Sequence, residues 1–107
     1  GRAVLRAGMP VADLARAMAV HRQTGAEGFH GGYGIGIGYR YLWHEAPIIR
    51  QSDTHTLEAG MVLSLFGFGA SNDASRFLFI AEPVIVTSTG LEDLCRQPRS
   101  ELRVVGV

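Results

Sequence analysis

The stretch from Gly31 to Pro47 constrains the fold of this 107-residue chain more than any other. Glycine occupies positions 32, 34, 36 and 38, and Tyr or Ile occupies each position between them. Because side chains alternate across a strand, this pattern predicts a strand with one apolar face and one face of bare backbone. Glycine inside a strand loses packing and costs conformational entropy. The run therefore marks a place of close approach, either by a ligand or by another strand.

Composition and charge narrow the range of partners. The chain has ten basic and ten acidic residues and a formal net charge of zero, and all ten basic residues are arginine. Without a basic cluster, we expect neither nucleic acid nor an anionic membrane as a partner. Cys95 is the only cysteine, which excludes an internal disulfide and favours a reducing, cytoplasmic location. The longest mostly apolar run, Met61 to Ala70, is too short to span a bilayer.

Hydrophobic periodicity predicts one helix followed by antiparallel strands. Pro10 suits a first helical turn, and apolar residues then recur at helical spacing, which predicts a helix over 11–24. A polar loop follows Pro47, and Glu82-Pro83 is expected to interrupt a later strand. Strands are predicted near 33–41, 61–68, 77–87 and 92–95. This order predicts an α+β fold in which the helix packs on a curved antiparallel sheet.

Four motifs in a fixed order carry a family resemblance. They are Gly-Tyr-Gly-Ile-Gly at 32–36, His-Glu-Ala-Pro at 44–47, Leu-Glu-Ala-Gly-Met-Val at 57–62 and Val-Ile-Val-Thr at 84–87. Their order resembles the C-terminal half of the pita-bread (M24) family of aminopeptidase P, methionine aminopeptidase and creatinase. The resemblance implies that residues 1–107 are one partial pita-bread domain of a longer chain. It also implies hydrolysis of C–N bonds in a small amide or peptide substrate, and a homodimer for the full-length protein.

The metal ligands of that family are mostly replaced here. Its metal-dependent members hold two metal ions with two aspartates, one histidine and two glutamates. The resemblance places Tyr33 at the histidine and Phe66 at the first glutamate, while the aspartates would precede this chain. The second glutamate corresponds to Glu82 if the alignment slips by one residue, and to Ala81 otherwise. Because metal ions need several converging oxygen or imidazole ligands, we expect no bound metal and no other cofactor.

The resemblance divides between two branches of the family. A tyrosine at the metal histidine also occurs in the metal-free branch, which includes creatinase and ectoine hydrolases. The spacing from Tyr33 to Trp43-His44-Glu45 is similar to that branch. His44 itself is more typical of the peptidases.

The candidate site residues follow from the same motifs. His44 corresponds to a family histidine that donates a hydrogen bond to the reacting carbonyl, a task that suits a group titrating near neutrality. His30 lies near a substrate-contacting histidine of the metal-free relatives, and Glu82 is a carboxylate in an apolar strand that needs a partner or a function. We therefore assign His44, His30 and Glu82 as candidate catalytic residues, and Tyr33 and Trp43 as substrate contacts. The alternative is an inactive relative that serves as a binding or dimerisation module.

Overall fold

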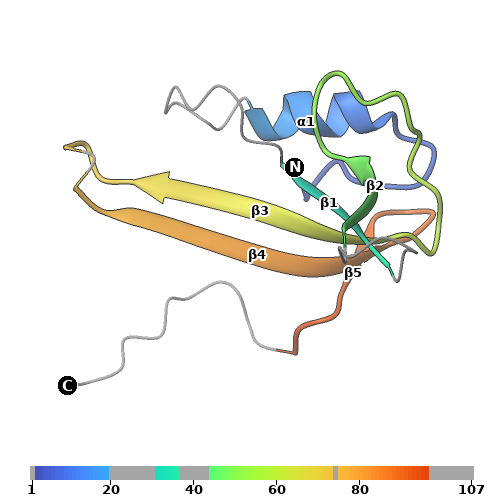
Figure 1. Ribbon diagram of the computed structural model, residues 1–107. Helices are drawn as coiled ribbons and strands as arrows, with labels where there is room; N and C mark the ends of the chain where they lie inside the picture. The colour runs from blue at the N-terminus through green and yellow to red at the C-terminus, as the bar shows by residue number, and fades with distance from the viewer. Residues whose placement is uncertain (1, 20–30, 37–43, 74, 97–107) are drawn as a thin grey trace.

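A single antiparallel sheet carries the fold. The computed structural model describes residues 2–19, 31–36, 44–73 and 75–96. Their elements are α1 (Val11–Ala19), β1 (Gly32–Ile35), β2 (His44–Ile48), β3 (Val62–Ala70), β4 (Phe77–Val86) and β5 (Leu91–Asp93). The strand order is β2-β1-β3-β4-β5, and α1 lies on one face of the sheet (Figure 1). The predicted combination of one helix with an antiparallel sheet is confirmed for the described residues.

The core lies between α1 and the sheet face that it covers. Val11, Leu14 and Ala15 are buried, and Met18 packs against them, as the helical spacing predicted. Their buried partners come from the strands and connections: Leu5, Ile49, Leu57, Leu63, Leu65, Val84 and Val86. Apolar contact of this extent is the main stabilising term of such a two-layer fold. Residues 20–24 of the predicted helix lie outside the described residues.

The glycines of β1 are approached by the backbones of both neighbouring strands. A Cβ on Gly32 would overlap the carbonyl oxygen of Ser64 in β3, and Gly32 has a φ of 141°, which favours glycine. A Cβ on Gly34 would lie 2.6 Å from the carbonyl oxygen of Ala46 in β2. Of the two explanations left open by the sequence, close approach by another strand applies at both positions.

Two features of the sheet differ from the prediction. Residues 44–48 form β2, which was not predicted as a strand, and Pro47 is tolerated there because β2 is an edge strand. Glu82-Pro83 does not interrupt β4, because β3 and β4 pair continuously from Val62 opposite Ile85 to Ala70 opposite Phe77. The strand predicted over 33–41 is described only to Gly36, and Ile37 lies outside the described residues.

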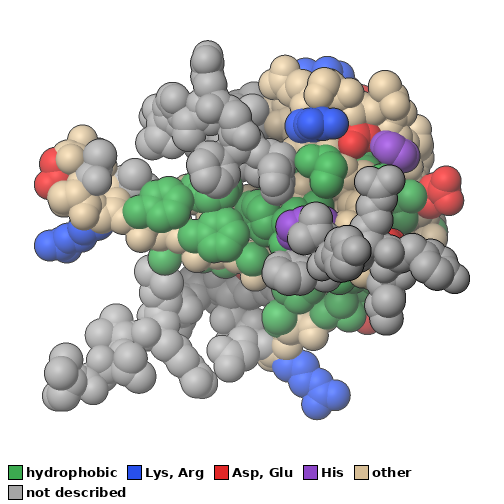
Figure 2. Space-filling view, in the orientation of Figure 1, with side chains coloured by type: hydrophobic (Ala, Val, Ile, Leu, Met, Phe, Trp, Pro, Cys, Tyr) green, Lys and Arg blue, Asp and Glu red, His purple; other side chains and the backbone are tan. Residues whose placement is uncertain are grey.

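The β3–β4 hairpin extends beyond α1 (Figure 1). On this projecting arm, defined here as residues 66–68 and 77–80, the side chains of Phe77, Leu78, Phe79 and Ile80 are all exposed. Since neighbouring residues of a strand point to opposite faces, both faces of the arm carry exposed apolar groups. Figure 2 shows apolar side chains gathered along this hairpin.

The start of the chain is tied to the last strands. The Arg2 guanidinium donates to Glu82 of β4 at 2.9 Å and to Asp93 of β5 at 2.5 Å. The backbone N–H of Ala7 donates to the carbonyl of Thr87 at 2.9 Å. These contacts hold residues 2 and 7 against β4, β5 and the turn between them.

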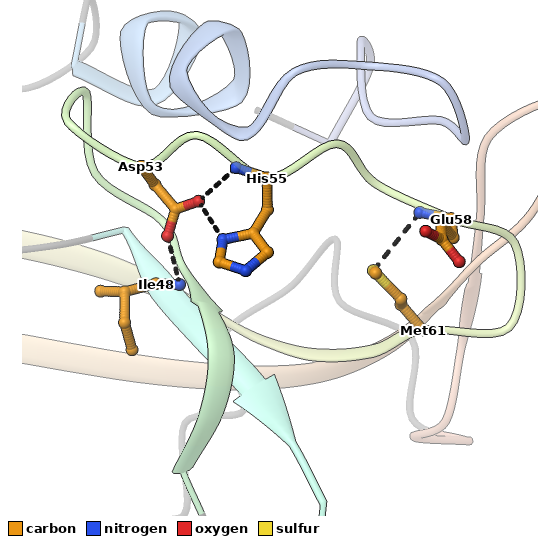
Figure 3. Close-up of polar contacts among 5 residues, drawn as sticks. All are labelled: Ile48, Asp53, His55, Glu58 and Met61. Atoms are coloured by element: carbon orange, nitrogen blue, oxygen red, sulfur yellow. Dashed lines mark hydrogen bonds and ion pairs between the residues drawn. The ribbon is translucent and has the colours of Figure 1, made fainter.

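Asp53 organises the connection from β2 to β3 (Figure 3). Its carboxylate accepts hydrogen bonds from the backbone N–H of Ile48 at 2.9 Å and of His55 at 2.8 Å, and lies 2.7 Å from Nδ1 of His55. Burial raises the pKa of Asp53, but the hydrogen bonds from His55 and Ile48 outweigh it and hold that pKa below its usual range. The ordered loop then presents the His55 carbonyl to the N–H of Val11 at the start of α1, at 3.0 Å.

The close backbone contact at Gly32 gives a first prediction. We expect Gly32→Ala to destabilise the protein by about 2–4 kcal/mol, because the added Cβ overlaps the Ser64 carbonyl and the φ angle is unfavourable for alanine. Gly8→Ala is the matched control: its φ is 82°, but a Cβ there meets nothing within 4 Å, so we expect a loss of only about 1–2 kcal/mol. Urea unfolding checks both, and equal losses would contradict the argument.

The Asp53 carboxylate gives a prediction about pH. A carboxyl whose folded pKa lies below its unfolded value of 3.8 stabilises the fold above that value, and the stabilisation is lost as the pH falls through the folded pKa. We expect Asp53→Asn to cost about 1–2 kcal/mol at pH 7, because two backbone N–H donors and the His55 ring lose a charged acceptor. Thermal unfolding from pH 7 to 2 should show the difference from wild type shrinking below about pH 4. A difference independent of pH would contradict this account.

Candidate functional site

Tyr33 and His44 meet on the sheet face opposite α1. Tyr33 pairs with Ser64 in β3, whereas the flanking glycines pair with the core residues Leu63 and Leu65, so the Tyr33 side chain points away from the core. In β2, His44 is opposite Ile35. The Tyr33 and His44 rings have centroids 4.1 Å apart and planes inclined at 49°. The structure thus brings together two of the five predicted site residues.

Phe66 and Ala81 share this face with Tyr33. The Phe66 ring meets Tyr33 edge-on at 5.1 Å, and Phe66 pairs directly with Ala81 of β4. The resemblance assigns Tyr33 to the metal histidine and Phe66 to the first metal glutamate, and it leaves Ala81 and Glu82 as the two possible positions of the second glutamate. The strand register therefore selects Ala81, and not Glu82, as the counterpart of the second glutamate.

Ring contacts continue from this point along the projecting arm. Phe66 and Phe79 have centroids 5.0 Å apart, Phe68 and Phe79 5.1 Å, and Phe68 and Phe77 5.7 Å. Such edge-on and tilted arrangements are favourable for aromatic rings. Together with Tyr33 and Phe66 they form a continuous aromatic row along β3 and β4.

Glu82 lies apart from this group. It pairs with Leu65, which is buried in the core, and so its side chain belongs to the face that carries α1. There its carboxylate accepts a hydrogen bond from Arg2 at 2.9 Å. A shift of one residue along a strand moves a side chain to the other face, and for this reason the structure does not bring Glu82 together with His44 and Tyr33.

One residue that was not predicted, Ser64, shares the face of Tyr33 and His44. His30 and Trp43 lie outside the described residues. The carboxylate of Glu45, next to His44, occupies the space where Gly36 would carry a Cβ, but Glu45 is opposite Gly34 and its side chain therefore lies on the other face of the sheet. Ser64 is a polar residue buried on the same face as Tyr33. The sequence signal for Ser64 was a serine inside an apolar run.

The donor atoms of this face do not fit the family's pair of metal ions. Its ligand positions hold a phenol, a phenyl ring and a methyl group. No group of three or more His, Cys, Asp or Glu side chains that could hold a metal ion occurs in the described part of the chain. What the face offers chemically is the imidazole of His44, the phenol of Tyr33, the hydroxyl of Ser64 and an apolar wall. An imidazole can accept and return a proton near neutral pH.

Comparisons with known proteins agree with the fold and with the motifs. A solved structure of an X-Pro aminopeptidase from Thermotoga maritima MSB8 matches with 26% sequence identity and a TM-score of 0.67, over 92% of this chain and 28% of that one. This chain therefore spans 28% of the length of that relative. A comparison with curated proteins gave no match. Among the helices that the structure describes, none is long and apolar enough to cross a membrane.

Residues 1–88 match the model of metallopeptidase family M24. The matched residues extend past the end of β4 and include the face that carries Tyr33, His44 and Phe66. The chain thus belongs to metallopeptidase family M24.

Proposed function

We propose that this chain is part of a hydrolase that cleaves C–N bonds in small amide or peptide substrates without the two metal ions of its family. The M24 match and the X-Pro aminopeptidase neighbour support a peptidase-like hydrolase. One observation carries the rest of the proposal. The His44 imidazole packs against Tyr33 on a face where Phe66 and Ala81 stand at the metal-ligand positions.

The proposed chemistry is proton transfer by His44. Its imidazole takes a proton from the water that attacks the substrate carbonyl carbon, and returns it to the nitrogen that leaves when the C–N bond breaks. Tyr33 restricts the orientation of the imidazole through the ring contact, and its phenol is a hydrogen-bond donor for the substrate. Glu82 takes no part, because it lies on the other face with Arg2. His30 and Trp43 keep their proposed roles as a second acid/base group and a substrate contact.

A finer assignment within the family belongs to the same proposal. Tyr33 at the histidine position and the spacing to Trp43-His44-Glu45 support the metal-free branch of creatinase-like and ectoine hydrolase-like proteins. The full-length protein would then be a cytoplasmic homodimer with a pita-bread domain. Residues 1–107 would supply the C-terminal half of that domain, and the remaining walls of the site would come from the rest of the chain.

A second candidate function is a binding or dimerisation module on an inherited fold. The projecting arm favours it, because Phe77 is 66% exposed and Leu78 is 49% exposed, on opposite faces of β4. Exposed apolar surface of this kind is typical of contact sites between proteins. This alternative predicts binding without turnover.

Replacing His44 tests the proposed hydrolysis. In the full-length protein that carries residues 1–107, we expect His44→Ala to lower kcat for a hydrolysed X-Pro peptide or small amide by about 10²–10⁴-fold, the usual contribution of proton transfer. His55→Ala is the matched control, since His55 is exposed and bonded to Asp53 outside the site. Unchanged turnover in both His44→Ala and His30→Ala would contradict the mechanism and favour the binding module.

Metal content is a separate test of the same proposal. After dialysis, elemental analysis of the full-length protein should find well below one equivalent of Mn, Co or Zn, because Tyr33, Phe66 and Ala81 replace three of the ligands. Turnover should also be unchanged by a chelator. One or more bound equivalents, or activity lost to the chelator and restored by metal, would contradict metal-free hydrolysis.

A further inference from the structure

Ser64 is a buried hydroxyl group in the middle of the candidate site. It lies in β3, opposite Tyr33 on one side and Pro83 on the other. The exposed fraction of Ser64 is 7%, and among the described residues it is the one polar residue whose whole surface is so little exposed. In the described part of the chain, no donor or acceptor forms a hydrogen bond with its side chain. The hydroxyl points to the same face as Tyr33 and Phe66.

An unpartnered hydroxyl in this place needs an explanation. Most buried polar side chains in native structures are hydrogen-bonded, since losing water without gaining a partner is unfavourable. An alanine would fill the same position in β3 without that cost. The neighbours of Ser64 on this face, the rings of Tyr33 and Phe66 and the ring of Pro83, are mostly apolar. In such surroundings a hydrogen bond to a bound molecule is stronger than in water.

We propose that Ser64 binds the substrate of this site and positions it for His44. This inference rests on the proposed function, since it takes the small amide or peptide substrate as the ligand. The hydroxyl would donate a hydrogen bond to the amide carbonyl oxygen of the substrate or accept one from its N–H. Tyr33 and Phe66 are only half-buried and His44 is exposed, so the side chains next to Ser64 are partly accessible to a ligand.

Ser64 is therefore a substrate-binding residue, and its effect should appear in binding more than in turnover. The test compares Ser64→Ala and Ser64→Thr with the wild-type full-length protein, using the tripeptide Ala-Pro-Ala as the probe. We expect Ser64→Ala to raise KM by about five- to tenfold, the effect of one net hydrogen bond, with kcat changed less than about twofold. Ser64→Thr keeps the hydroxyl and should restore KM. Ser88→Ala, at an exposed serine after β4, is the control and should change neither constant.

Thermal unfolding supplies a readout that does not depend on activity. Because the hydroxyl has no partner in the described fold, we expect the Tm of Ser64→Ala to equal or exceed that of wild type. A Tm several degrees lower would show that the hydroxyl is bonded within the protein and would overturn the inference. An unchanged KM in Ser64→Ala would overturn it as well, while leaving the proposed hydrolysis intact.

A failure of the proposed function can be told apart from a failure of this inference. If the wild-type protein does not cleave Ala-Pro-Ala, calorimetry measures its binding to wild type, Ser64→Ala and Ser64→Thr. Binding that Ser64→Ala weakens and Ser64→Thr restores would support the role of Ser64 without hydrolysis. No binding to wild type, or equal binding to all three proteins, would overturn the inference.

Discussion

The close approach of the β2 and β3 backbones to the glycines of β1 is the constraint on which the rest of the structure depends. The carbonyl of Ser64 lies against Gly32 on one side, and the carbonyl of Ala46 lies against Gly34 on the other. Any side chain at these positions would push β2 or β3 away. Because β1 joins β2 to the rest of the sheet, the same contacts decide that His44 reaches Tyr33. The site geometry thus depends on the absence of side chains at Gly32 and Gly34 as much as on the rings of Tyr33 and His44.

The alternation of side chains along each strand then decides which chemical groups lie on the sheet face opposite α1. Ala81 and Glu82 are neighbours in sequence, yet one lies opposite Phe66 in the aromatic row and the other is held by Arg2 on the face of α1. A carboxylate at position 81 would have lain opposite Phe66, on the same face as Tyr33. With aromatic and methyl groups at those positions, the polar chemistry of the face comes from an imidazole and hydroxyl groups. In the proposed hydrolysis these groups would act by proton transfer and hydrogen bonding.

Sequence patterns predicted α1 and the end of β4, because both depend on residues that are close together in the sequence. The stripe of Val11, Leu14 and Ala15 defined the helix, and the β-branched run at 84–87 defined the end of β4. β2 was not predicted, because Pro47 and the polar residues after it are typical of a loop. Its pairing with the glycine-rich strand β1 became visible only in the structure. The face occupied by Glu82 was also unpredictable, since it depends on a register set by pairing with β3. Ser64 was visible only as an interruption in an apolar run, and its burial beside Tyr33 required the paired sheet.

The link between Arg2 and the last strands has a consequence for the order of folding. Its hydrogen bonds to Glu82 and Asp93 join residues that are 80 and 91 positions apart, so forming them closes nearly the whole segment into a loop. Loop closure over such a distance costs more entropy than pairing β3 with β4 through a short turn. The hairpin is therefore expected to form early and the Arg2 contacts late. During synthesis, Arg2 can contact both of its partners only after the ribosome has released the chain as far as Asp93.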